Sequence, residues 1–246
     1  MRLALALLVL VPVVVAQPKK GDDAPKVLMA LPFGIPAGRT TRVELRGLRL
    51  DNVRDAKTAA GPLKLLNKGK VTVPNQQDAS KVGDSRLQLD VTAPTTGDAI
   101  DVTLTTADGR TTMHRLGIDP TALIAEKEPN DSFRQAQEVQ PGQTIAGAIE
   151  RAQDVDVYRM EVKAGQTIRV EVRAARWGGA LDAFLSVYDA AGQLIDSCDD
   201  IKGSTDAAID FRASRDGVYY FVVSDANDQG GVTHAYRLHV ERLASK

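Results

Sequence analysis

Short segments in which apolar and polar residues alternate recur along most of this chain. In the first half, six such segments are separated by turn-forming residues, among them Asp108-Gly109. Alternation with a period of two puts the apolar residues on one face of a strand, and regular turn signals favour antiparallel pairing. The first half therefore predicts a small β-sandwich with strands near 26–31, 41–46, 70–73, 86–91, 99–104 and 111–116.

The second half carries eight more segments of this kind, joined by turns rich in Gly and Asp. An eight-stranded antiparallel sandwich of the jelly-roll type is the natural architecture for this spacing. The predicted strands lie near 144–149, 155–162, 166–173, 183–188, 193–196, 207–211, 218–223 and 235–240. The fold class is thus all-β with two sandwich domains, at 27–118 and 126–241, joined by a linker at 119–125.

The N-terminus predicts export. Arg2 is followed by an apolar run from Leu3 to Val15, then Ala16 and a polar stretch. A basic residue, a short apolar stretch and a small residue are typical of a secretory signal peptide, here 1–16, cleaved after Ala16. A membrane anchor is the alternative, but a spanning helix needs about 20 apolar residues. We expect a secreted, periplasmic or cell-surface protein that does not span the membrane, with a polar spacer at 17–26.

Charge is nearly balanced over the chain but unevenly distributed. Residues 17–125 carry 16 Lys and Arg against 12 Asp and Glu, whereas residues 126–246 carry 14 against 20. The acidic second half disfavours nucleic acid as a partner and is compatible with divalent cations. The single cysteine, Cys198, has no internal disulfide partner and is expected to be a buried, inert thiol.

An acidic cluster at the start of the second domain predicts a calcium site. The segment Glu126-Lys-Glu-Pro-Asn-Asp131 is followed by Asp154-Val-Asp156. Carboxylate and amide oxygens without His or Cys are the ligands that Ca²⁺ selects. The candidate ligands are Glu126, Glu128, Asn130, Asp131, Asp154 and Asp156, and the ion would tie the linker to the sheet. The alternative is that these residues only cap a helical turn and solubilise the linker.

Further motifs in the second half resemble a known family. Beside the two acidic motifs stand Ala164-Gly-Gln-Thr167, Asp216-Gly-Val-Tyr-Tyr220 and Tyr236-x-Leu-x-Val240. In this order and spacing they resemble the bacterial pre-peptidase C-terminal domain family over 126–241, which is similar to the collagen-binding modules of secreted collagenases. The resemblance implies a β-sandwich accessory domain without catalytic residues, and it implies Ca²⁺ ligation by the entrance segment. More weakly, Pro36 to Leu50 resembles bacterial immunoglobulin-like domains.

A second acidic cluster and two aromatic residues are further candidates. Asp182, Asp199, Asp200 and Asp206 could bind a second cation, although such residues more often form turns. Trp177 lies in a glycine-rich turn beside Arg176, and Tyr220 alternates with Tyr219, so both are candidate ligand-binding residues, with packing over the sandwich end the alternative for Trp177. Tyr219, Phe221 and Tyr236 are expected in the core.

Catalytic interpretations have little support in the sequence. Gly83-Asp-Ser-Arg-Leu87 has a serine like that of a lipase block, but a nucleophilic serine needs a histidine held by an acid, and no Asp-x-x-His follows. His114, His234 and His239 all fall in strand contexts, with the last two expected on opposite faces. We therefore predict a non-enzymatic adhesion or targeting module for an extracellular polymer or surface partner. The alternative is a structural subunit of an envelope assembly, or an accessory to a separate secreted protease.

Overall fold

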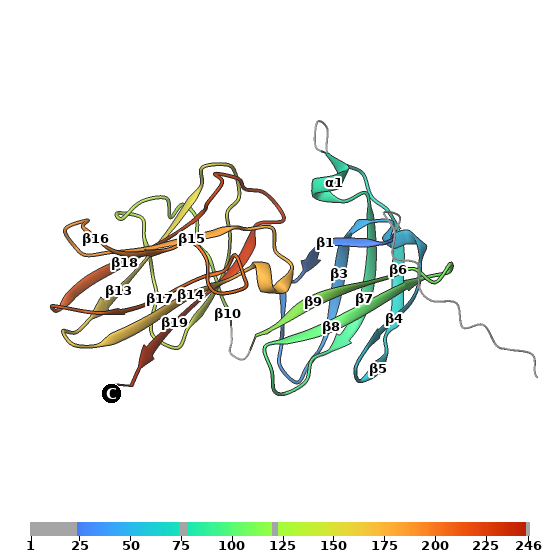
Figure 1. Ribbon diagram of the computed structural model, residues 1–246, viewed down its shortest axis with the longest axis horizontal. Coiled ribbons are helices and arrows are strands. Elements are labelled where there is room, and N and C mark those ends of the chain that lie inside the picture. The colour runs from blue at the N-terminus through green and yellow to red at the C-terminus, as the bar shows by residue number, and fades with distance from the viewer. Residues whose placement is uncertain (1–23, 74–77, 120–122, 245–246) are drawn as a thin grey trace, which may run out of the picture.

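Two β-sandwiches stand end to end in the computed structural model, which describes residues 24–73, 78–119 and 123–244 (Figure 1). The expected signal peptide and all but the last residues of the expected spacer lie outside these ranges. The helices of the described residues are three short ones, α1 (Ala79–Val82), η1 (Leu50–Asn52) and η2 (Ala175–Trp177). In this part of the chain no helix has the length and apolar character needed to cross a membrane.

The N-terminal sandwich has the strand order of an immunoglobulin domain. Its two sheets run β1-β3-β7-β6 and β2-β9-β8-β4-β5, which match the A-B-E-D sheet and the G-F-C sheet of that fold. The strands are β1 (Lys26–Leu31), β2 (Gly34–Pro36), β3 (Thr40–Leu48), β4 (Val53–Thr58), β5 (Gly61–Pro62), β6 (Lys64–Lys70), β7 (Ser85–Thr92), β8 (Ala99–Thr106) and β9 (Thr111–Asp119).

Alternation explains the strands that were predicted here and those that were not. Along β7, Leu87, Leu89 and Val91 are fully buried between partly exposed neighbours. The strand predicted at 70–73 is wrong, because β6 ends at Lys70 and a bulge interrupts its period of two. β2 and β5 have only three and two residues, too few for a periodic pattern, and the charged β4 was also missed.

The C-terminal sandwich is a jelly roll, as its sequence pattern predicted. All eight expected strands are present, and they form the two four-stranded layers β12-β19-β14-β17 and β13-β18-β15-β16. These strands are β12 (Thr144–Ala148), β13 (Val155–Val162), β14 (Thr167–Arg173), β15 (Ala183–Tyr188), β16 (Leu194–Cys198), β17 (Ala207–Arg212), β18 (Gly217–Asp225) and β19 (Ala235–Leu243). Two short strands, β10 (Leu123–Ala125) and β11 (Gln137–Glu138), extend the edges of the layers in parallel.

The core of this sandwich holds the aromatic residues expected there. Tyr219, Phe221 and Tyr236 are buried between the two layers, which confirms their prediction. Cys198 differs from the expectation of a buried thiol, because it lies partly exposed on β16 at the border of the core. β16 is an edge strand, so its side chains are covered from one side only.

Trp177 joins the two sandwiches and is not an exposed ligand contact. Its side chain is only 1% exposed, and its indole lies over Gly117 of β9. A Cβ at Gly117 would come within 2.0 Å of the indole, so only glycine permits this contact. The Phe33 ring packs beside it at 5.9 Å between ring centroids. The glycines around Trp177 indicated an exposed turn, but they serve close packing against the neighbouring domain.

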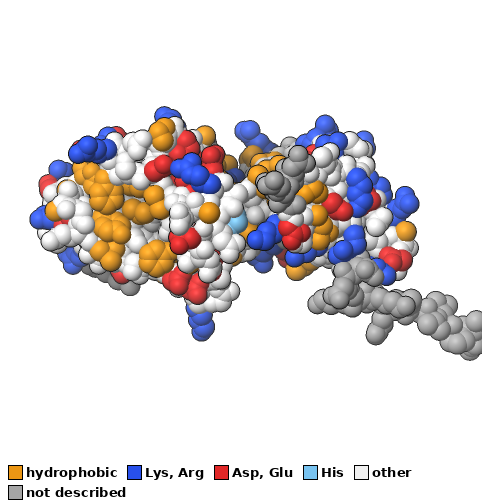
Figure 2. Space-filling view, turned by 90° about the horizontal axis from the view of Figure 1, so that it is seen from above, with side chains coloured by type: hydrophobic (Ala, Val, Ile, Leu, Met, Phe, Trp, Pro, Cys, Tyr) orange, Lys and Arg blue, Asp and Glu red, His pale blue; other side chains and the backbone are white. Residues whose placement is uncertain are grey.

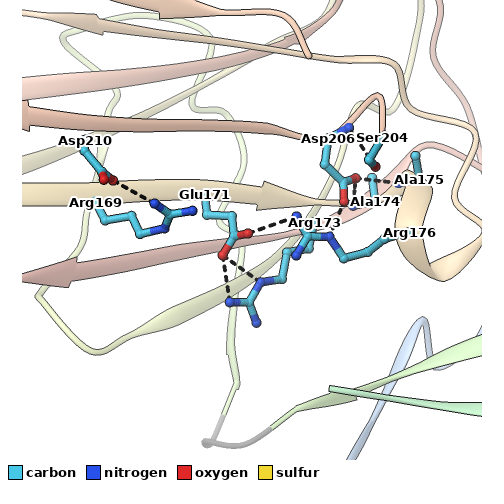
Figure 3. Close-up of polar contacts among 9 residues, drawn as sticks. All are labelled: Arg169, Glu171, Arg173, Ala174, Ala175, Arg176, Ser204, Asp206 and Asp210. Carbon is cyan, nitrogen blue, oxygen red and sulfur yellow. Dashed lines mark hydrogen bonds and ion pairs between the residues drawn. The ribbon is translucent and has the colours of Figure 1, made fainter. Parts of the chain in front are cut away.

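A buried carboxylate holds Trp177 in place. Asp206 accepts hydrogen bonds from the backbone N–H groups of Ala174 and Ala175, both at 2.7 Å, and pairs with Arg176 (Figure 3). Arg176 also reaches Glu171 of β14 at 2.9 Å. Asp206, expected in the second acidic cluster, therefore anchors η2 instead.

An ion pair reinforces the junction. Arg237 of β19 donates to both carboxylate oxygens of Asp119, at 3.3 and 3.5 Å, and both side chains are buried. The guanidinium also lies over the Phe33 ring, 5.6 Å from its centroid. Burial raises the pKa of Asp119, and the charge of Arg237 opposes that rise. Loss of either partner would leave a buried charge unpaired, which is strongly destabilising.

Replacement of Gly117 by alanine should open the junction. The added Cβ has to displace the indole of Trp177, and such overpacking typically costs about 1–3 kcal/mol. Because Trp177 is the only tryptophan, its emission should shift to longer wavelength as water reaches the ring. Gly69→Ala on β6 is the matched control, since nothing lies within 4 Å of a Cβ there. Unchanged emission in Gly117→Ala would contradict the packing described.

The junction should also weaken in acid, because it buries a neutral histidine. His114 is 6% exposed, contacts Gly178, and burial lowers its pKa to about 4 from an ordinary value of 6.5. Below pH 6.5 the unfolded chain takes up a proton that the folded protein refuses, so stability falls down to about pH 4, by roughly 3 kcal/mol in total. Urea unfolding between pH 4 and 7 should show a smaller loss in His114→Gln. Equal losses in the two proteins would refute this role.

Candidate functional site

Glu126 is the residue that ties the linker to the C-terminal sandwich. After β10 pairs in parallel with β12, the Glu126 backbone N–H donates to Ala146 at 3.0 Å. Its Oε2 accepts the Ala148 N–H at 2.9 Å. Its Oε1 lies 2.5 Å from the Tyr158 hydroxyl and 3.1 Å from the Tyr236 hydroxyl. The carboxylate is therefore fixed by contacts to three strands, β12, β13 and β19.

Three of the predicted cation ligands meet at this point. Glu126, Glu128 and Asp156 each offer a carboxylate oxygen, and these oxygens lie within 4.8 Å of one another. Asp156 is buried on β13, where its Oδ2 accepts the Tyr236 hydroxyl at 2.6 Å. We refer to these three residues as the carboxylate cluster. The sequence already groups Asp156 with the entrance segment (residues 126–131) as predicted ligands, although the two lie far apart along the chain.

Buried oxygens without donors surround the cluster. Among the described residues, Asn130 Oδ1 and Asp156 Oδ1 have no hydrogen-bond partner, and Asp154 Oδ1 has only an ion pair to Arg151 at 3.3 Å. Buried polar atoms are normally satisfied, so each exception requires an explanation. All three atoms are acceptors, which is the arrangement that a bound cation would complete.

Electrostatics around the cluster also favours a cation. Burial, followed by the charges of Glu126 and Asp154, raises the pKa of Asp156 to about 9. Burial and the same neighbouring charges raise the pKa of Glu128 as well. Carboxylates so close together repel each other when ionised, and a bound divalent ion removes that repulsion.

The remaining predicted ligands, Asn130, Asp131 and Asp154, differ in their contacts around the carboxylate cluster. The Asn130 amide group donates to Glu126 at 3.1 Å, which leaves its carbonyl oxygen free to face a cation. Asp154 is buried beside the cluster and accepts the Glu150 N–H at 2.8 Å. Asp131 and Asp154 both pair with Arg151, at 3.1 and 3.3 Å, but only Asp154 is buried and keeps an oxygen without a hydrogen bond from the described residues. The residues that fit Ca²⁺ are thus Glu126, Glu128, Asn130, Asp154 and Asp156.

Tyr158 and Tyr236 complete the site and were not predicted as parts of it. Their hydroxyls lie 2.7 Å apart and bind the carboxylates from the core side. Burial raises the pKa of both phenols well above 10, so both remain proton donors. A signal was present for Tyr158, because it stands two residues after Asp156 and so shares its face of β13.

The second acidic cluster forms only in part. Asp182, Asp199 and Asp200 bring carboxylate oxygens within 4.8 Å of one another, whereas Asp206 lies under η2. Asn227 donates to Asp182 at 2.8 Å, and Asp199 and Asp200 are exposed. These contacts are those of solvated loop residues.

Tyr220 belongs to a row of side chains that crosses an outer face of the jelly roll. Strand register places Leu194, Tyr188, Tyr220 and Arg159 opposite one another on four successive strands. Phe133 stacks on Tyr220 with ring centroids 4.4 Å apart and lies 5.4 Å from Tyr188. We call Leu194, Tyr188, Tyr220 and Phe133 the aromatic row. Figure 2 shows a group of hydrophobic side chains on the surface of the jelly-roll domain.

The residues considered for catalysis have structural contacts. Ser85 is buried, its hydroxyl donates to the Gly47 carbonyl at 3.0 Å and accepts the Leu50 N–H at 2.9 Å. His239 contacts Thr144 at 2.9 Å, and His114 packs at the domain junction. Among the described residues, no histidine lies in a hydrogen bond to Ser85.

Comparison with known proteins finds similarity to part of a protease. The chain is 36% identical over 103 residues to a probable subtilase-type serine protease of Deinococcus radiodurans, in a match that covers 41% of this chain and 14% of that protein. This chain therefore matches only a small part of that relative's length.

Solved structures with similarity include the pre-peptidase C-terminal domain of a Bacillus anthracis collagenase, at 19% identity and a TM-score of 0.37. That match covers 47% of this chain and all of the collagenase domain. The secreted serine protease VesC of Vibrio cholerae matches at 11% identity and a TM-score of 0.31, over 85% of this chain and 48% of its own.

The family model for the bacterial pre-peptidase C-terminal domain matches residues 154–225. This range runs from Asp154, beside the carboxylate cluster, to the end of β18, and it includes Tyr188 and Tyr220 of the aromatic row. It does not include the entrance segment, which stands before it. Residues 154–225 of the C-terminal jelly roll therefore belong to the bacterial pre-peptidase C-terminal domain family.

Proposed function

We propose that this protein is an exported, non-catalytic module that binds an extracellular polymer or a surface partner through the aromatic row. The row supports this function because it runs over the three neighbouring strands β16, β15 and β18 and lies on the outer face of the sheet. Partly exposed aromatic rings supply large contact areas with little loss of conformational entropy, and they are enriched in recognition surfaces.

The two outer faces of the jelly roll differ in a way that favours this choice. The other face carries a ladder of ion pairs, in which Arg169 binds Asp210 at 2.9 Å and Arg173 binds Glu171 at 2.7 Å (Figure 3). Those charges satisfy one another and offer little to a neutral polymer. Beyond Tyr220, the next strand carries Arg159, whose partner Glu138 lies 3.8 Å away at the rim. An apolar centre with a charged rim is the usual anatomy of an interface.

A second candidate function is an accessory or structural subunit, for example beside a separate secreted protease. The observation in its favour is the edge strand β16, where Leu194 is 56% and Ile195 is 44% exposed. An edge strand with exposed aliphatic side chains can pair with another polypeptide. The curated relative, by its name a protease, is matched over a small part of its length only.

Replacement of Tyr220 by alanine should weaken polymer binding about tenfold, as expected for an aromatic contact at the centre of a recognition surface. The measurement is co-sedimentation with insoluble collagen, chitin, cellulose and peptidoglycan. Met113→Ala is the matched control, because Met113 is 65% exposed on the other domain. Equal binding by Tyr220→Ala and the control would refute the aromatic row as the binding face. Absence of binding to all four polymers, with capture by a protein partner through β16, would favour the second candidate.

The entrance segment and the carboxylate cluster are proposed to hold Ca²⁺. Glu126, Glu128, Asp154 and Asp156 would supply carboxylate oxygens and Asn130 its amide oxygen, with backbone carbonyls or water completing the six to eight ligands that the ion takes. The unpartnered oxygens of Asn130 and Asp156 are the observation that supports this proposal. The ion would fix the end of the linker on the jelly roll.

Calcium should raise the stability of the protein by about 2.7 kcal/mol when its concentration is 100 times the dissociation constant. Thermal unfolding in CaCl₂ and in chelator should show this gain in the wild type and a much smaller one in Glu128→Gln. Glu138→Gln is the control, since Glu138 is exposed and outside the cluster. Tb³⁺ provides a second readout, because Tyr158 and Tyr236 would sensitise its luminescence. A full calcium response in Glu128→Gln would remove that residue from the ligand set.

A further inference from the structure

A cleft of about 800 Å³ opens between the two sandwiches. On the N-terminal side it is lined by α1 and by Leu28 of β1, and on the C-terminal side by Glu150 and residues 229–234. None of the residues of the carboxylate cluster or the aromatic row lines it. Junctions between domains are frequent ligand sites.

Backbone contacts define the C-terminal wall of the cleft. The Gly231 N–H donates to the Ile149 carbonyl at 2.9 Å, and the Ala180 N–H donates to Thr233 at 2.9 Å. Gly230 lies directly against the backbone of Arg151, where a Cβ would come within 2.1 Å of the carbonyl oxygen. This wall therefore keeps its shape without a ligand.

The N-terminal wall is fixed in a similar way. Asp78 caps α1 by accepting the Ser80 N–H at 2.8 Å, and Gly83 at the end of α1 lies against the backbone of Gly47. Trp177 and the Asp119–Arg237 ion pair hold the two walls at a fixed distance. A preformed opening binds its ligand without an ordering cost in the protein.

The two walls of the cleft carry one charge each that has no ion-pair partner in the described part of the chain, while the third charged group of the lining, Asp78, caps α1. Lys81 stands on α1 and Glu150 on the facing wall, both are exposed, and neither has an ion-pair partner among the described residues. Burial chiefly lowers the pKa of His234 on the C-terminal wall, and the charge of Lys81 lowers it further, so Lys81 lies near the facing wall. Leu28, Val82 and Val232 add aliphatic surface, and Val232 is 60% exposed.

We propose that this cleft binds an extended peptide segment with an acidic and a basic side chain flanking an aliphatic one. The acidic group pairs with Lys81, the basic group pairs with Glu150, and the aliphatic side chain lies against Val232 and Leu28. Ser80 and Thr233 also line the cleft and supply hydroxyl groups to it.

Charge and surface type favour a peptide over a glycan. A neutral glycan has no charge for Lys81 or Glu150, and an acidic glycan has a partner only for Lys81. The lining contains aliphatic side chains, and its one ring, the imidazole of His234, is only 7% exposed and offers little surface on which a sugar could stack. A peptide supplies both charges and an aliphatic group in one short segment. This site is separate from the proposed polymer-binding face.

The test is an NMR titration of the ¹⁵N-labelled protein with the acetylated, amidated peptide Val-Glu-Val-Lys-Val. Shift changes should appear at α1 and at residues 229–234. Lys81→Gln and Glu150→Gln should each weaken binding about tenfold, the loss expected for one charged contact. The neutral peptide Val-Gln-Val-Gln-Val lacks both charges. Its affinity for the wild type should therefore be no higher than the affinity of the charged peptide for either variant.

Controls separate this proposal from the others. Lys57→Gln and Glu161→Gln remove exposed charges that do not line the cleft, and both should bind the charged peptide like the wild type. Tyr220→Ala should also bind it normally, so loss of polymer binding does not affect the result. Equal affinity for the charged and neutral peptides would overturn the proposal. So would chitohexaose, used as the glycan probe, if it shifted the cleft residues and the peptide did not.

Discussion

The contact between the Trp177 indole and Gly117 is the constraint on which the arrangement of this molecule depends. Two sandwiches joined by a short linker would otherwise be free to rotate, since interfaces between domains are small and polar by default. Here a buried aromatic side chain fills a space that exists only because β9 has no Cβ at that point. Asp206 is the buried anchor behind it, because its carboxylate binds the backbone of η2 and the side chain of Arg176.

This junction fixes the positions of the two walls of the cleft relative to each other. Its close packing also makes an unpaired charged side chain in the junction destabilising. The Asp119–Arg237 pair is buried and gains from mutual contact, whereas His114 is buried without a partner for its Nε2 atom. A charged imidazole there would face the desolvation penalty with nothing to compensate for it. Stability and acid sensitivity of the domain arrangement therefore come from the same close packing.

Alternation predicted the jelly roll well because strands such as β17 and β18 bury every second side chain and leave the others partly or fully exposed. The same argument failed at β6, where a bulge breaks the period, and at β2 and β5, which are too short to show one. Trp177 was misjudged for a different reason. Glycine beside tryptophan indicates a turn whether the ring is exposed or buried. Only the packing of the neighbouring domain determines whether the ring is covered. The carboxylate cluster was predictable from its residue types, and alternation along β13 puts Tyr158 on the same face as Asp156. Tyr236 comes from β19, and its contacts with Glu126 and Asp156 are tertiary contacts that no local pattern shows.

The contacts of Glu126 determine what a cation at the carboxylate cluster could do. Each strand that holds this residue, β12, β13 or β19, belongs to the C-terminal sandwich. Asp156 and Glu128 extend the same set, and the N-terminal sandwich contributes no member to it. An ion bound there would fasten the end of the linker to the jelly roll and would stabilise that domain. The relation between the two domains would still rest on Trp177 and the Asp119–Arg237 pair, so calcium and domain orientation should be separable.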